Sequence, residues 1–87
     1  MLRITRIDEG LQTLRLRLEG KIVGDWVPVL EDELSRCARA RRLVLDLAQV
    51  DFASTPAIQV LRAARARGAE LQGVSPLVSS LIESLEP

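Results

Sequence analysis

The fold is decided by the central stretch of the chain, which reads Leu43-Val44-Leu45-Asp46-Leu47-Ala48-Gln49-Val50-Asp51-Phe52-Ala53-Ser54-Thr55-Pro56. Its first five residues are almost all apolar and are bounded by charge, which favours a fully buried strand over a helix turn. The pattern then predicts a loop over residues 48–54. Thr55 followed by Pro56 is typical of a helix start, with Thr55 as the N-cap and the proline in the first helical position.

A second strand after this helix completes a βαβ unit. The helix has apolar residues at helical spacing and is expected to stop at Gly68. Residues 69–74 are expected to form a short strand. Because a helix joins the two strands of the unit, the strands should be parallel, with a right-handed crossover. Ser75 and Pro76 repeat the helix-start signature, and a last apolar helix face runs toward the end of the chain.

The N-terminal part of the chain predicts an antiparallel hairpin followed by a helix. Residues 2–8 alternate weakly and residues 11–19 alternate cleanly between apolar and charged side chains, with a tight turn closed at Gly10. Asp25 is a good N-cap for a helix over residues 26–40.

The predicted fold is therefore an α/β domain. We expect residues 1–87 to form one domain, with a mixed sheet of four to five strands, an N-terminal antiparallel hairpin, a βαβ unit and about three helices.

Composition excludes several classes of protein. The 87 residues contain 12 basic and 12 acidic side chains, whereas a nucleic-acid binder usually carries a net basic balance. There is no histidine, and Cys37 is the single cysteine, so the commonest general base and the usual zinc ligands are missing. We expect no catalytic residue, no metal and no cofactor.

The sequence also predicts the compartment. No stretch approaches the roughly 18–20 apolar residues that a membrane span requires, and the first residues lack a signal-peptide core. A lone cysteine suits a reducing compartment. We therefore expect a cytoplasmic protein without direct membrane insertion.

The chain resembles the STAS domain family, which includes anti-sigma factor antagonists. In that family a buried strand ending Asp-Leu leads into a loop with a Phe, and then into Asp-Ser-Ser-Gly-Leu at the start of a helix. Residues 45–58 match this motif. Residues 16–21 match the early Leu-x-Gly-Glu strand, and residues 68–76 match the late Gly-x-x-Leu…Ser-Pro segment. The three motifs in register cover almost the whole chain.

The resemblance implies a partner-switching function in bacterial signalling that regulates transcription. In such systems an anti-sigma factor with serine kinase activity phosphorylates the first serine of the motif, and the unmodified domain binds that kinase and frees the sigma factor. This serine falls on Thr55, with Ser54 as a second candidate acceptor. Ser54 stands where the family has aspartate, Pro56 where it has the second serine, and Ala57 where it has glycine. A hydroxyl at a helix N-terminus suits a phosphate, since backbone N–H groups and the helix dipole favour negative charge there.

The same resemblance implies a docking surface for a protein partner at the start of this helix. Its members are Ser54, Thr55, Pro56, Gln59 and Arg62. An alternative function is a non-phosphorylated scaffold, or an accessory subunit of a larger complex such as an ABC-type lipid transporter or a sensor assembly. An enzyme is the third possibility and the least supported, because Asp46 has no histidine or metal partner. We expect Asp46 to accept backbone hydrogen bonds after its strand.

Overall fold

The computed structural model describes residues 1–10, 13–37 and 42–84. Their elements are, in chain order, β1 (Leu2–Asp8), β2 (Thr13–Ile22), α1 (Trp26–Arg36), β3 (Arg42–Ala53), α2 (Thr55–Ala66), β4 (Glu70–Gln72) and α3 (Pro76–Ser84). No helix in these ranges is long and apolar enough to cross a membrane.

The four strands form one mixed sheet in the order β1-β2-β3-β4. β1 and β2 pair antiparallel, whereas β2–β3 and β3–β4 pair parallel. Parallel neighbours need a crossover connection, which α1 supplies between β2 and β3 and α2 supplies between β3 and β4. The predicted hairpin, βαβ unit and mixed α/β sheet are thus confirmed, with four strands.

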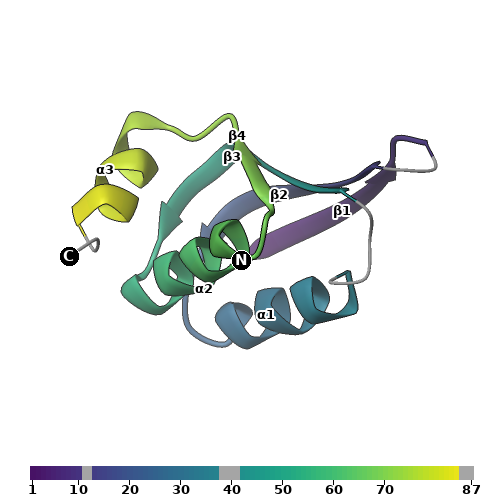
Figure 1. The fold of residues 1–87 in the computed structure, drawn as a ribbon. Coiled ribbons are helices and arrows are strands. Elements are labelled where there is room, and N and C mark those ends of the chain that lie inside the picture. The colour runs from purple at the N-terminus through teal and green to yellow at the C-terminus, as the bar shows by residue number, and fades with distance from the viewer. Residues whose placement is uncertain (11–12, 38–41, 85–87) are drawn as a thin grey trace.

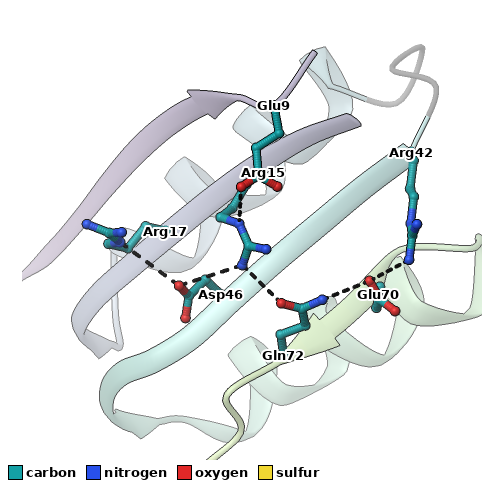
Figure 2. A network of polar contacts seen from close by, with 7 residues as sticks. All are labelled: Glu9, Arg15, Arg17, Arg42, Asp46, Glu70 and Gln72. Atoms are coloured by element: carbon teal, nitrogen blue, oxygen red, sulfur yellow. Dashed lines mark hydrogen bonds and ion pairs between the residues drawn. The ribbon is translucent and has the colours of Figure 1, made fainter. Parts of the chain in front are cut away.

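The core lies on the face of the sheet that α1 and α2 cover (Figure 1). In β2 the leucines at positions 14, 16 and 18 are buried in this core, because alternate residues of a strand share a face. All three helices add buried side chains to the same cluster. The opposite face of the sheet carries charged and polar side chains, including Arg15, Arg17, Asp46 and Gln72 (Figure 2).

β3 is longer than predicted, because it continues to Ala53 through most of the stretch expected to be a loop. Its pairing with β2 slips twice, between Asp46 and Gln49 and again between Val50 and Phe52. Extra residues of this kind bend a strand and break its period-two alternation, so the sequence pattern loses the signature of a strand. The expectation for Asp46 is confirmed, since its Oδ1 accepts the N–H of Ala48 at 3.0 Å.

α1 begins as predicted, with Asp25 as N-cap, although no side-chain capping hydrogen bond forms. The helix ends at Arg36 with Cys37 as C-cap, and the predicted continuation over residues 38–40 lies outside the described residues. β1 is tied to α1 by the Nη2 of Arg6, which donates to the Oε1 of Glu33 at 2.7 Å. This hydrogen bond raises the pKa of Arg6 above its ordinary value.

Candidate functional site

The candidate docking site lies where β3 passes into α2, and its helix begins one residue earlier than predicted. Ser54 is the N-cap, in an extended conformation, so Thr55 is the first helical residue and Pro56 the second. The physical reason is a strand-like hydrogen bond: the N–H of Ser54 donates to the carbonyl of Ile22 at 3.0 Å, while its own carbonyl accepts the N–H of Ile58 at 2.9 Å. The interpretation of Thr55 as the N-cap was therefore wrong.

The two candidate acceptor hydroxyls differ in their surroundings. The Oγ of Ser54 is buried and has no hydrogen-bond partner within the described residues. It does not cap α2, even though its residue occupies the N-cap position. Thr55 is exposed to solvent. A modifying enzyme would therefore reach the Thr55 side chain far more readily than the Ser54 hydroxyl.

The first turn of α2 provides few donors for a bound anion. Backbone N–H groups at the start of a helix have no partner within the helix, and they are the usual ligands of a phosphate there. Proline has no N–H, so Pro56 removes one of them. The N–H groups of Thr55 and Ala57 remain at this end of the helix.

The structure brings together only part of the predicted docking surface as exposed side chains. Thr55, Pro56 and Gln59 are exposed on the first turns of α2. Arg62 is half-buried and already interacts within the protein.

Phe52 is an exposed residue beside this site that the sequence reasoning did not select. It lies at the end of β3, two residues before the N-cap, and its side chain is 41% exposed. It pairs with Lys21 of β2. Because Phe52 was expected in a loop, its place on the polar face of the sheet was visible only once the register of β3 was known.

Asp46 is held by structural contacts on that polar face (Figure 2). Its Oδ2 lies 3.8 Å from the Nη1 of Arg15 and 4.0 Å from the Nε of Arg17, and its Oδ1 accepts the N–H of Ala48 where the register of β3 shifts. Both carboxylate oxygens of Asp46 therefore have partners within the sheet.

Solved structures with this fold are known. The chain superposes with a TM-score of 0.75 at 12% identity on the unphosphorylated form of the anti-sigma factor antagonist SpoIIAA, covering 93% of this chain and 82% of that one. A STAS-domain antisigma-factor antagonist from Rhodobacter sphaeroides gives a TM-score of 0.56 at 22% identity, covering 80% of this chain and 82% of that one. The crystal structure of Mglu gives a TM-score of 0.63 at 25% identity, covering 83% of this chain but only 19% of that one.

Sequence comparison identifies a family for the chain, although not an individual relative. No curated protein matches the chain closely enough to assign it a role. The family model described as "Mlab, STAS domain" matches residues 5–86, almost the whole chain. Together with the four-stranded mixed sheet and its three helices, this match confirms the resemblance, and the chain belongs to the STAS domain family.

Proposed function

We propose that this chain is a protein-docking module of the anti-sigma factor antagonist kind, which binds its partner through the N-terminus of α2. The observation that carries the proposal is the exposure of Thr55, Pro56 and Gln59 on the first turns of a helix that follows directly from β3. The fold shared with SpoIIAA supports it. The proposal includes a cytoplasmic location and no catalysis, cofactor or nucleic-acid binding.

Phosphorylation of Thr55 is the proposed switch. A phosphate would add about −1.5 to −2 charges at the exposed start of α2. A partner surface that fits the bare, nearly neutral turn of Thr55, Pro56 and Gln59 would then meet a dianion, and binding would weaken. The buried Oγ of Ser54 makes that residue the poorer acceptor. The partner in this reading is an anti-sigma factor with serine kinase activity.

A non-phosphorylated scaffold or accessory subunit is the second candidate, for example in an ABC-type lipid transport or sensor assembly. Pro56 favours it, because the missing N–H leaves the first turn of α2 with one donor fewer for a phosphate.

Intact mass and phosphosite mapping on protein purified from its native cells separate the two candidates. The switch predicts one phosphate on Thr55 that is lost in Thr55→Ala and retained in Ser54→Ala. It also predicts that Thr55→Glu releases a co-purifying partner that Thr55→Ala keeps. If Thr55 stays unphosphorylated across growth and stress conditions, and the partner binds Thr55→Glu as tightly as the wild type, the switch is contradicted and the scaffold function is supported.

A further inference from the structure

A groove lies between α1 and α2, which run side by side on one face of the sheet (Figure 1). Its volume is about 200 Å³. The apolar part of its lining comes from both helices and from β3: Leu34, Cys37, Leu43, Val60, Ala63 and Ala64. On α2 the lining begins at Val60, near the middle of the helix, and ends at Arg67, its C-cap.

The two walls of the groove carry opposite charges. Glu31 stands on the α1 wall and Arg67 at the end of α2, and both are exposed. Within the described ranges neither of them makes an ion pair, whereas Asp32, the next residue of α1, is held by Arg36 at 2.9 Å. The groove thus presents an apolar floor between a carboxylate and a guanidinium that have no ion-pair partner among residues 1–10, 13–37 and 42–84.

We propose that this groove is the interface of a homodimer, in which two copies of the chain pack groove against groove about a two-fold axis that runs along it. Such an axis places α1 of one copy over α2 of the other. Glu31 and Arg67 line opposite walls of one groove of only about 200 Å³, so the axis brings each Glu31 toward the Arg67 of the second copy, and the proposed pair forms twice. A second copy supplies both complementary charges, in the correct arrangement, by symmetry alone.

The dimer requires the outer surfaces of α1 and α2 beside the groove as well as the groove itself. A stable interface buries roughly 800 Å² on each partner, or about 15% of the surface of this chain; the total is 5351 Å². The molecule measures 34 × 28 Å across its two longer axes.

The dimer surface and the proposed docking surface lie toward opposite ends of α2. The helix has 12 residues, so its ends are about 18 Å apart. Thr55 and Pro56 begin it, and the groove residues Ala63 and Ala64 lie near its end. The groove lining therefore does not include the first turn of α2. Dimerisation is measured on the chain alone, so its test is independent of the proposed function.

Sedimentation equilibrium of the full chain, from about 1 µM to about 1 mM, tests the proposal. At low salt the wild type should form a dimer that weakens as salt is added, since salt screens the two ion pairs. Glu31→Arg and Arg67→Glu, each alone, should weaken the dimer about tenfold or more, because each places like charges opposite one another twice. Mixing the two variants in equal amounts should restore a dimer, now of one copy of each, with both pairs attractive.

Two further variants, each placing an arginine on α2, keep the test decisive if a charge reversal disturbs folding. Ala63→Arg fills the groove and should give a monomer, whereas Ala66→Arg, an equal change at an exposed position of α2 outside the groove lining, should leave the dimer intact. Circular dichroism of each variant checks that the helices form. A wild-type chain that stays monomeric at every concentration overturns the proposal, as does a dimer that survives Ala63→Arg and both charge reversals.

Discussion

Arg15 of β2 reaches across β3 to bind Gln72 of β4, with its Nη1 donating to the Gln72 Oε1 at 3.0 Å (Figure 2). Val44 of β3 is paired with Arg15 on one side and with Glu70 of β4 on the other, next to the line of this contact. Val44 is only 2% exposed, yet it is not part of the core cluster beneath the helices. We infer that the apolar stem of Arg15 shields Val44 on the face that the helices leave open.

We expect Arg15→Ala to lower the free energy of unfolding by about 1–2 kcal/mol, because it uncovers Val44 and removes contacts to three side chains at once. Those contacts join Arg15 to Glu9 at 3.1 Å, to Gln72 and to Asp46. Urea unfolding measures the loss. Arg15→Met, which keeps most of the stem, should recover about half of it.

The matched control is Arg17→Ala on the same strand and the same face. Arg17 is 45% exposed and makes one contact at 4.0 Å to Asp46. Such an exposed pair is worth little, so the loss should stay below about 0.5 kcal/mol. Equal losses for the two arginines would contradict the account of Val44.

The two serines at helix starts should respond differently to alanine. Ser75 caps α3, since its Oγ accepts the N–H of Val78 at 3.2 Å, so Ser75→Ala should cost about 1 kcal/mol. The Ser54 Oγ is buried without a partner, so Ser54→Ala should change stability by less than about 0.5 kcal/mol or improve it. Thermal unfolding of both variants measures the contrast. A loss at Ser54 as large as that at Ser75 would show that its hydroxyl does cap α2.

Gly73 should tolerate a side chain less well than Gly24. Both have positive φ, +67° and +55°, which disfavours any residue with a Cβ. A Cβ at Gly73 would lie 2.9 Å from the Cβ of Ala48, whereas one at Gly24 meets nothing within 4 Å. We expect Gly73→Ala to cost about 2–3 kcal/mol and Gly24→Ala about 1 kcal/mol by urea unfolding. A cost at Gly24 that equals or exceeds the cost at Gly73 would refute the close approach of the two chain segments.

The parts of the fold that local chemistry determines could be predicted from the sequence. The clean alternation around Leu16 predicted β2, Asp25 predicted the start of α1, and Ser75 before Pro76 predicted the start of α3. Each of these signals depends on a residue and its near neighbours in sequence.

The errors arose where pairing between distant segments decides the structure. The end of β3 follows from its bulged register with β2, which residues 48–53 do not reveal on their own. The N-cap of α2 is Ser54 and not the predicted Thr55, because the N–H of Ser54 donates to the carbonyl of Ile22, 32 positions earlier in the chain. The exposure of Phe52 and the burial of the Ser54 hydroxyl depend on the same pairing.

Site-specific photo-crosslinking in native cells tests the central claim, that the chain docks through the N-terminus of α2. A photoreactive residue at Gln59, exposed on α2, is compared with one at Thr5, exposed in β1. The account predicts a discrete adduct between the Gln59 variant and one partner protein, with none from the Thr5 variant. An adduct from Thr5 and none from Gln59 would place the docking surface elsewhere and contradict the proposal.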